Sequence, residues 1–411
     1  MAVKAGYKQT EIGVIPEDWE VVLLPNALDF ISGKAHEQYI QEFGSFTVVN
    51  SKFISTNGTI AKYSTKNFCP ARNGDILMVM SDLPNGKALA KCFIVECDNK
   101  YAVNQRVCIL RPKKGISQFF SYQLSRNPYF LAFNDGVSQT HLLNGVFRAC
   151  PVIVPPFPEQ QAIAEALSDV DQLIASLDQL IEKRRALKTA TMQQLLTGKT
   201  RLAGFSGEWE TKRLEEVGSC HRGVAYKGDT DLAEYDTDNT IRLLRSNNVQ
   251  DAKILPVGVQ YVTSTRVNER QILSQNDILI CMANGSKALV GKSGLFNIDN
   301  GYAYTFGAFM SCFRTEVNAA NEIFVSYLFQ SELFRYYVGN LLAGSSINNL
   351  TPKSVELMEF MMPSKIEQKA IAEVLSDMDA EITELEQRRD KTQAIKQGMM
   401  QELLTGRTRL I

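Results

Sequence analysis

The chain contains one long segment twice, and this repeat restricts what the sequence can fold into. Residues 159–202 and 367–410 align at a constant offset of 208 residues (367 − 159) without insertion or deletion, and 25 of the 44 positions are identical. In both copies, apolar residues recur at steps of four and three, which is the spacing of a coiled-coil seam. We therefore expect two long helices that pack on each other within the chain as an antiparallel coiled coil. Two coiled coils used for self-association are the alternative.

The expected seam has five apolar residues in each copy. They are Ile163, Leu167, Val170, Ile174 and Leu177 in the first copy, and Ile371, Leu375, Met378, Ile382 and Leu385 in the second. Each helix would be roughly 55–60 Å long at 1.5 Å per residue. Ser364 and Glu367 match a capping box, and Gly198 and Gly406 lie where a helix C-terminus is expected. The second copy is less apolar at 387–390, where we expect weaker pairing.

Weaker similarities extend the repeat beyond the helices. Trp19-Glu20 corresponds to Trp209-Glu210, Asp75–Leu77 to Asp277–Leu279, Gly136 and Ser138 to Gly344 and Ser346, and Pro155 to Pro363. The offset grows along this series from 190 (209 − 19) to 208 (363 − 155), so the second half has gained residues before its helix. We therefore expect globular domains at 1–158 and 203–366, and spacer helices at 159–202 and 367–411.

The two globular halves show short strand-like runs in the same rough order. In the first half they lie at 46–54, 75–80, 91–97, 106–110 and 152–154, with an amphipathic helix at 117–133. In the second half they lie at 241–244, 259–262, 277–282, 309–314 and 357–362, with a helix near 322–338. Short strands with few helices between them favour mixed or antiparallel α/β domains over a doubly wound sheet. The expected fold is two α/β domains separated by two long helices, with an internal pseudo-twofold repeat.

Polar loops between these runs are rich in side chains that suit the edges of DNA bases. Arg matches guanine, and Asn or Gln matches adenine. The candidate DNA-contacting residues are Lys87, Asn104, Gln105, Arg106, Ser138, Gln139, Thr140 and His141 in the first half, and Arg245, Asn247, Asn248, Asn284, Ser286, Lys287, Ser345, Ser346 and Asn348 in the second. Each loop taken alone is also compatible with a solvated turn. Duplication on a symmetric frame favours DNA contact.

Composition narrows the function classes. A chain of 411 residues with 45% hydrophobic and 22% charged residues is typical of a soluble protein of two or three domains. We expect no secretory or membrane-spanning segment. The eight cysteines show no CxxC pair, so we expect reduced thiols in the cytoplasm and no zinc site. The balance of charges is +4 in residues 1–158 and −3 in 203–366, which predicts weak phosphate binding by this chain alone.

The apparent catalytic motifs are incomplete. Gly291-Lys292-Ser293 ends like a phosphate-binding loop, but Ser286 stands where that loop requires a glycine. The segment 127–130 (Asn-Pro-Tyr-Phe) lacks one proline of the Asn-Pro-Pro-Tyr/Phe motif of amino-methyltransferases, and no glycine-rich cofactor loop accompanies it. With three histidines, no nucleophile–base pair can be assigned. The sequence favours a binding scaffold that has no catalytic, metal or cofactor site of its own.

Taken together, these features resemble the specificity subunits of type I restriction-modification systems. The resemblance rests on the segments Tyr7–Trp19, Gly74–Leu77, Asn104-Gln105, Pro155–Gln160, Gly207–Glu210, Asn276–Leu279, Gly344–Ser346 and Pro363–Gln368, and it covers essentially the whole chain. Asn104-Gln105 has no clear counterpart in the second half, where Asn268 and Gln271 are the nearest candidates.

The resemblance implies a non-catalytic subunit that recognises a two-part site in double-stranded DNA. Each domain would be a target recognition domain for one part, and the helix pair would set the spacing between the parts. Two methylation subunits would transfer a methyl group from S-adenosylmethionine to adenine N6 after the adenine leaves the base stack. Restriction subunits would add ATP-driven cleavage, so S-adenosylmethionine, ATP and Mg²⁺ would bind the partners. A free-standing adenine methyltransferase and a coiled-coil adaptor without DNA binding remain the alternatives.

Overall fold

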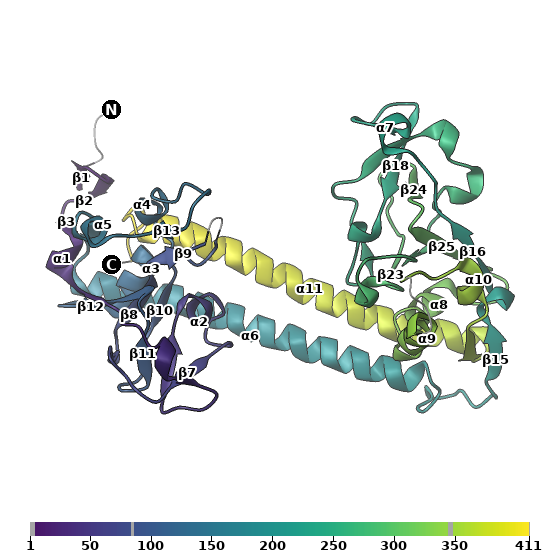
Figure 1. Ribbon diagram of the computed structural model, residues 1–411, viewed down its shortest axis with the longest axis horizontal. Coiled ribbons are helices and arrows are strands. Elements are labelled where there is room, and N and C mark those ends of the chain that lie inside the picture. The colour runs from purple at the N-terminus through teal and green to yellow at the C-terminus, as the bar shows by residue number, and fades with distance from the viewer. Residues whose placement is uncertain (1–4, 84–85, 344–347, 411) are drawn as a thin grey trace. The chain divides into compact units, whose positions relative to one another are not determined.

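The computed structural model describes residues 5–83, 86–343 and 348–410. The chain divides into two compact units, of which the first comprises residues 1–178 and 387–411 and the second comprises 179–386. Each unit contains one globular domain and one half of each of two long helices (Figure 1).

The repeated segments form two helices of equal length. α6 spans Phe157–Leu195 and α11 spans Lys365–Leu403, with 39 residues each, or about 58 Å at 1.5 Å per residue. Gly198 and Gly406 follow the helix ends with φ of 68° and 70°, so the expected C-terminal glycines are confirmed. Half of the expected capping box is present at α11: the N–H of Glu367 lies 3.5 Å from Ser364 Oγ, but the Glu367 carboxylate binds Arg201 instead.

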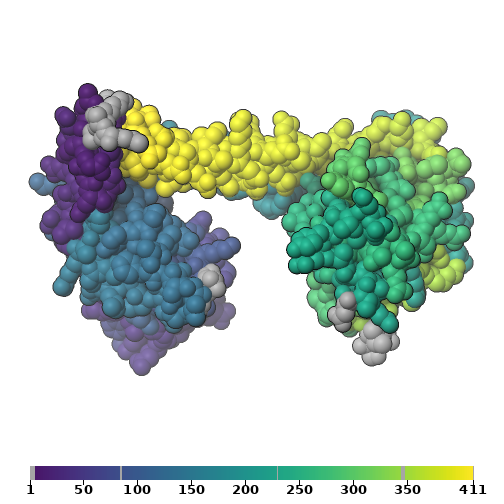
Figure 2. All heavy atoms as spheres, turned by 90° about the horizontal axis from the view of Figure 1, so that it is seen from above, coloured from purple at the N-terminus to yellow at the C-terminus, as the bar shows by residue number. Residues whose placement is uncertain are grey.

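All ten residues of the expected seam are buried or half-buried. The helices run antiparallel within each unit. In the first unit, the N-terminal half of α6 lies beside the C-terminal half of α11 (Figure 1). In the second unit, the C-terminal half of α6 lies beside the N-terminal half of α11. The side of α11 that does not face α6 is visible at the surface (yellow in Figure 2).

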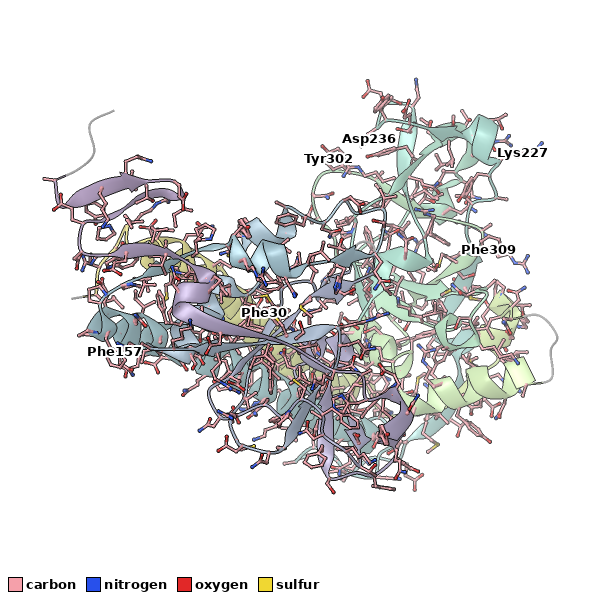
Figure 3. All side chains as sticks on the ribbon, turned by 60° about the vertical axis from the view of Figure 1, so that its left-hand side comes forward. Phe30, Phe157, Lys227, Asp236, Tyr302 and Phe309 are labelled. Atoms are coloured by element: carbon pink, nitrogen blue, oxygen red, sulfur yellow. The ribbon has the colours of Figure 1, made fainter. Side chains whose placement is uncertain are left out.

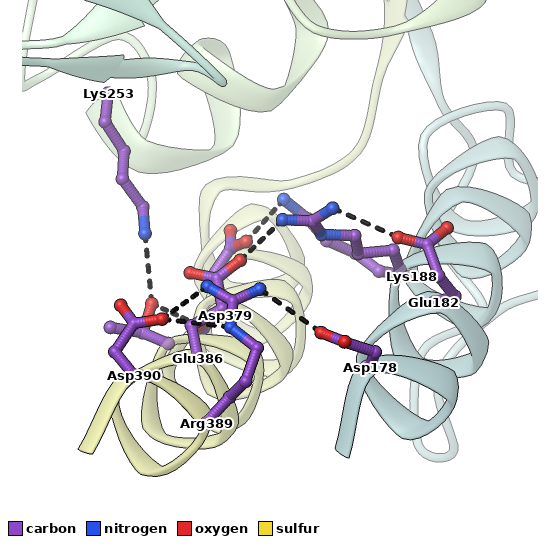
Figure 4. Close-up of polar contacts among 10 residues, drawn as sticks. Asp178, Glu182, Lys188, Lys253, Asp379, Glu386, Arg389 and Asp390 are labelled. Carbon is purple, nitrogen blue, oxygen red and sulfur yellow. Dashed lines mark hydrogen bonds and ion pairs between the residues drawn. The ribbon is translucent and has the colours of Figure 1, made fainter. Parts of the chain in front are cut away.

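The order of charges along each helix explains the antiparallel direction. The ion pairs are Asp171–Lys396 (2.6 Å) and Asp178–Arg389 (3.6 Å) in the first unit, and Lys188–Asp379 (2.7 Å) and Arg185–Glu386 (2.6 Å) in the second. Figure 4 shows Asp178–Arg389 and Lys188–Asp379. In both α6 and α11, the acidic partners come first along the chain and the basic partners follow. An antiparallel pair therefore joins opposite charges, whereas a parallel pair would place like charges together. Arg389 lies in the segment 387–390, where we expected weaker pairing.

One cluster of side chains attaches each domain to its helix pair. Tyr122 donates a hydrogen bond to Asp171 Oδ2 (2.7 Å), and Lys396 Nζ lies 2.6 Å from the other oxygen and 5.0 Å from the centroid of the tyrosine ring. The second unit repeats the cluster with Tyr327, Asp379 and Lys188, at 2.8, 2.7 and 5.2 Å. The internal repeat therefore extends from the sequence to side-chain contacts.

The first domain is built on two four-stranded sheets with the strand orders β10-β8-β12-β4 and β11-β6-β7-β5. Among its described strands, β11 and β6 are the parallel pair. The strands are β1 (Tyr7–Thr10), β2 (Gly13–Pro16), β3 (Glu20–Leu23), β4 (Leu28–Ser32), β5 (Ile40–Gln41), β6 (Phe46–Val49), β7 (Lys62–Ser64), β8 (Ile76–Val79), β9 (Ser81–Asp82), β10 (Cys92–Ile94), β11 (Tyr101–Val103), β12 (Val107–Pro112), β13 (Thr140–His141) and β14 (Pro151–Val154). The helices are α1 (Leu24–Ala27), α2 (Ser51–Ser55), α3 (Ser117–Leu124), α4 (Pro128–Leu131) and α5 (Asn144–Arg148), with a 3-10 turn η1 (Glu37–Tyr39).

The second domain has a six-stranded sheet, β16-β25-β22-β23-β20-β19, and a four-stranded sheet, β17-β21-β18-β24. Its strands are β15 (Glu210–Arg213), β16 (Gly218–Arg222), β17 (Leu232–Ala233), β18 (Thr240–Leu244), β19 (Val249–Gln250), β20 (Lys253–Ile254), β21 (Gln260–Thr263), β22 (Ile278–Cys281), β23 (Ser293–Leu295), β24 (Tyr304–Phe306), β25 (Met310–Thr315) and β26 (Glu359–Met362). Its helices are α7 (Gly228–Asp231), α8 (Glu322–Leu328), α9 (Glu332–Ala343) and α10 (Pro352–Glu356), with 3-10 turns η2 (Leu214–Glu216), η3 (Ser246–Asn248), η4 (Ser264–Arg266), η5 (Glu269–Gln271) and η6 (Lys287–Leu289). Both domains mix parallel and antiparallel pairs, so the expected α/β class is confirmed.

Three expected elements are broken by local side-chain contacts. The strand expected at 46–54 ends at Val49, because the Asn50 side chain accepts from Phe53 N and starts α2. The helix expected at 117–133 breaks between α3 and α4, where Arg126 has φ of 57° and Asn127 caps the next turn. The helix expected near 322–338 breaks between α8 and α9, where Ser331 Oγ accepts from the N–H of Phe334.

Candidate nucleic-acid interface

The fold brings three predicted loops of the first unit together. β9 pairs antiparallel with β13, which places Ser81-Asp82 beside Thr140-His141. The N–H of Met80 donates to the carbonyl of Arg106 (2.9 Å), which adds the corner between β11 and β12. Ser81-Asp82, the corner at 104–106 and the strand β13 are therefore joined by backbone hydrogen bonds.

One carboxylate holds the described residues of the segment 81–87, which are 81–83 and 86–87. Asp82 accepts hydrogen bonds from the backbone N–H groups of Leu83 (2.9 Å), Ala88 (2.7 Å) and Leu89 (3.1 Å). The Lys87 side chain is exposed. The neighbouring Gln139 is exposed and donates to Ser81 Oγ at 2.9 Å.

The loop at 135–141 is held by a second carboxylate. Asp135 accepts from the N–H groups of Val137 and Ser138 and from the Ser138 hydroxyl (2.7 Å). These hydrogen bonds hold the pKa of Asp135 below its usual range, chiefly through the Ser138 backbone. Thr140 is buried and donates to Asn134 (3.1 Å), whereas His141 is exposed.

The Asn104-Gln105 pair is tied to a residue that sequence reasoning did not single out. Both side-chain amides donate to Glu37 Oε1, at 3.1 Å from Asn104 and 2.8 Å from Gln105. The hydrogen bond from Asn104 is the main cause that lowers the pKa of Glu37. Asn104 is buried, and Gln105, Arg106 and Glu37 are exposed. This corner therefore presents the Glu37 carboxylate beside the exposed guanidinium of Arg106.

The second unit assembles its loops in the same way. The N–H of Met282 donates to the carbonyl of Phe309 (2.8 Å), and Ala283 forms a bridge with Asn349. The Asn348 side chain donates to the carbonyl of Gly285 (3.2 Å). The predicted residues Asn284 and Asn348 are half-exposed, and Ser286 and Lys287 are exposed. Ser345 and Ser346 lie outside the described residues.

The loop after β18 contains one structural and two accessible residues. Asn248 is buried, accepts from Arg245 N (2.9 Å), and donates to the carbonyls of Leu255 and Val257 (2.9 Å each). Its side chain holds the loop together and is not available to a base. Arg245 is half-buried and Asn247 is exposed.

Backbone hydrogen bonds identify the counterpart of Asn104-Gln105 in the second unit. Asn104 N donates to Val49 O, and Gly307 N donates to Leu244 O, both at 3.0 Å. The counterpart is therefore Gly307-Ala308, and Phe309 takes the place of Arg106. The nearest candidates in the sequence, Asn268 and Gln271, are not the counterpart, because Asn268 precedes the turn η5 and Gln271 ends it.

A glycine supports the backbone of this corner in each unit. A Cβ atom at Gly33 would lie 2.1 Å from Asn104 O, and one at Gly223 would lie 2.1 Å from Gly307 O. Neither position can accept a larger residue without moving the corner. Phe309 itself is 71% exposed, on the same edge of the second unit as Lys227 (Figure 3). The sequence placed it at the start of the strand expected at 309–314, whereas β25 begins one residue later, at Met310.

Within the described residues, no group of His, Cys, Asp or Glu has the arrangement of a metal site. The eight cysteines are free, and burial raises the pKa of Cys92, Cys150 and Cys220 to about 12. These thiols are therefore poor nucleophiles. Among the residues that the structure describes, no helix is long and apolar enough to cross a membrane.

Comparison with known proteins identifies the family. The model of the type I restriction modification DNA specificity domain matches residues 16–183 and 206–397. The chain belongs to this family. Both matched segments include a globular domain and most of the long helix that follows it.

The curated relatives are named as specificity subunits of type I restriction enzymes. The StySPI specificity subunit of Salmonella potsdam and the EcoKI specificity subunit of Escherichia coli K12 are each 32% identical over 48% of this chain. These alignments span 42% of each relative, so the chain covers less than half of their length. The MjaVIII specificity subunit of Methanocaldococcus jannaschii is 25% identical over 96% of this chain and 94% of its own.

Solved structures support the fold. The S subunit of a type I restriction-modification system from M. genitalium has a TM-score of 0.58 at 14% identity, covering 98% of both chains. A chain from a study of assembly and conformational transition of the type I system also has a TM-score of 0.58, at 16% identity, covering 95% of this chain and 99% of its own.

Proposed function

We propose that this chain is the DNA-recognition subunit of a type I restriction-modification complex. The observation that carries the proposal is the pair of loop clusters on matching frames, within a family of DNA specificity domains. Each unit would recognise one part of a two-part site in double-stranded DNA. α6 and α11 pass from one unit into the other and would fix the number of unread base pairs between the two parts.

Within each unit, the exposed polar residues of the loop cluster would contact DNA. Gln105, Arg106 and Lys87 are the best placed in the first unit, and Asn247, Asn284 and Lys287 in the second, because they are accessible at the surface. Asn104 and Asn248 support their loops from inside. With a formal charge of −1, the chain would gain much of its affinity for phosphates from its partners.

The proposed partners are two methylation subunits and the restriction subunits of the same system. S-adenosylmethionine would bind the methylation subunits, and ATP and Mg²⁺ would bind the restriction subunits. The outward side of the helix pair would be available to a partner, because the seam uses only one side of each helix. The work of this chain would be to place adenines of the target within reach of the methylation subunits.

The decisive experiment is methylation mapping in cells that lack other adenine methyltransferases. The chain is co-expressed with the methylation subunit encoded beside it, and modified adenines are located by single-molecule sequencing. We expect a two-part motif with a fixed gap and one modified adenine on each strand. Exchange of residues 1–158 for those of another family member should change one part of the motif only.

Two results would favour the alternatives. Methylation by the chain without a partner, together with S-adenosylmethionine binding in calorimetry, would indicate a free-standing methyltransferase. A blank map from a chain that co-purifies with the methylation subunit, and that shows no sequence preference in DNA binding, would indicate an adaptor.

A further inference from the structure

Each unit has a corner with the same backbone hydrogen bonds, but the side chains at the two corners differ in polarity and size. In the first unit, the corner between β11 and β12 places the Glu37 carboxylate under the amides of Asn104 and Gln105. In the second unit, the corner between β24 and β25 carries Gly307, which has no side chain, and Ala308, whose methyl group is too short to fill the same space. The space under the second corner is therefore open.

A pocket of about 410 Å³ occupies this space. Its walls include Tyr226, Arg245, Asn247 and Phe309. Tyr226 and Phe309 supply aromatic surface, Arg245 supplies a cation, and Asn247 supplies an amide. A flat aromatic ligand with hydrogen-bond acceptors on its edge matches this combination, and a DNA base has both properties.

Arg245 has hydrogen-bond donors that the described residues leave unused. Its backbone is fixed, because its N–H donates to Asn248 (2.9 Å). Its guanidinium is weakly held: Nη2 lies 3.5 Å from the carbonyl of Gly258, and Nε has no hydrogen-bond partner among the described residues. A buried donor without a partner is costly, so a bound acceptor would relieve it. The corresponding residue of the first unit is Asn50, whose side chain accepts from the N–H of Phe53 as the N-cap of α2.

We propose that this pocket recognises a guanine in the part of the target that the second unit reads. Arg245 donates to guanine O6 and N7, the acceptor pair that a guanidinium matches with two hydrogen bonds. Phe309 packs against the neighbouring base and excludes water. An adenine in this place would present its N6 donor to the donors of Arg245 and is rejected. The inference rests on the proposed function and specifies one base contact within it.

The test uses the purified complex of the full chain with its methylation subunit. Binding is measured to a set of duplexes that carry each base in turn at every position of the mapped motif. The wild-type complex should prefer guanine at one position of the second unit's part, by roughly five- to 150-fold. Arg245→Gln should remove this preference and leave the preferences at the other positions unchanged.

Two controls separate base contact from loss of folding. Arg213→Gln changes an exposed arginine on β15, away from the corner, and should preserve the guanine preference. The Arg245→Gln complex should also keep the preferences of the first unit, which shows that the chain is folded and assembled.

Other results would overturn the inference. An equal loss of affinity for all duplexes would place Arg245 on a phosphate, and unchanged preferences would place it away from DNA. A wild-type complex without preference at any position would overturn the proposed function itself, which distinguishes the two failures.

Discussion

The buried carboxylate of Glu159 makes a strong prediction about Arg409. The Glu159 side chain has no exposed surface and accepts from three donors: Trp19 Nε1 at 2.8 Å, and Arg409 Nε and Nη2 at 2.5 and 2.6 Å. Arg409→Met would leave a buried charge with one neutral donor. Breaking a buried pair in this way costs about 3–5 kcal/mol. Because the Arg409 side chain is 30% exposed and water can replace part of it, we expect about 3 kcal/mol.

Differential scanning calorimetry of the full chain measures this effect. The first unit has 203 residues (178 + 25), and a unit of that size loses about 2–4 °C for each kcal/mol, so its transition should fall by about 6–12 °C. Arg407→Met is the matched control, since Arg407 is 67% exposed and lies 3.8 Å from Glu402; it should cost under about 0.5 kcal/mol. Equal shifts for the two variants would refute the reasoning.

The same substitution in the second unit provides an internal comparison. Arg201 binds Glu367, which is 2% exposed, at 2.5 and 2.7 Å. Among the described residues, Trp209 Nε1 has no hydrogen-bond partner, so it does not replace the lost donors as Trp19 does in the first unit. Arg201→Met should therefore destabilise its unit at least as much as Arg409→Met does. Hydrogen exchange at the start of each helix would assign each loss to its unit.

Three further predictions concern the helix pair and the loops. Burial raises the pKa of Tyr122 and Tyr327 above the ordinary value of 10.0, so their contribution to stability is full below pH 10 and is lost as pH rises through the folded pKa. Replacing both by Phe should flatten the fall in melting temperature measured between pH 9 and 11, and an unchanged slope would contradict this. Inserting seven residues into α6 and seven opposite them in α11 keeps the seam in register, and should lengthen the unread gap by about three base pairs in methylation mapping. The same insertion in α6 alone should disrupt pairing and lower the melting temperature. Arg106→Gln should weaken recognition of one part of the target by ~1–3 kcal/mol in duplex titrations, whereas an equal loss on all sequences would indicate a phosphate contact.

The helices could be predicted from sequence because their signal is long and periodic. Identity at 25 of 44 positions and the seam spacing located α6 and α11, and the seam residues are buried as expected. The breaks at Asn50, Arg126 and Ser331 were missed, because each depends on a single side chain or dihedral angle that outweighs a longer apolar pattern.

The roles of individual loop residues could not be predicted in the same way. An asparagine that supports a loop and one that reads a base have the same side chain, and only the contacts of Asn104 and Asn248 distinguish them. The match between Asn104-Gln105 and Gly307-Ala308 shares no residue type, so backbone hydrogen bonds were needed to find it. Glu37 was missed because it lies 67 residues from Asn104 in the sequence.

The glycines beneath the two corners have a consequence for how such a protein acquires new targets. A Cβ atom added at Gly33 or Gly223 would lie 2.1 Å from the carbonyl oxygen of Asn104 or Gly307, respectively. The two glycines therefore allow the same close approach of the main chain, whichever side chains the corner carries. The backbone tolerates Asn-Gln-Arg in one unit and Gly-Ala-Phe in the other. The side chains of this corner can therefore differ while its backbone keeps the same path. Changes in three neighbouring codons can therefore alter the side chains that one corner presents to DNA. Such changes do not require any change in the sheets or in the helix pair.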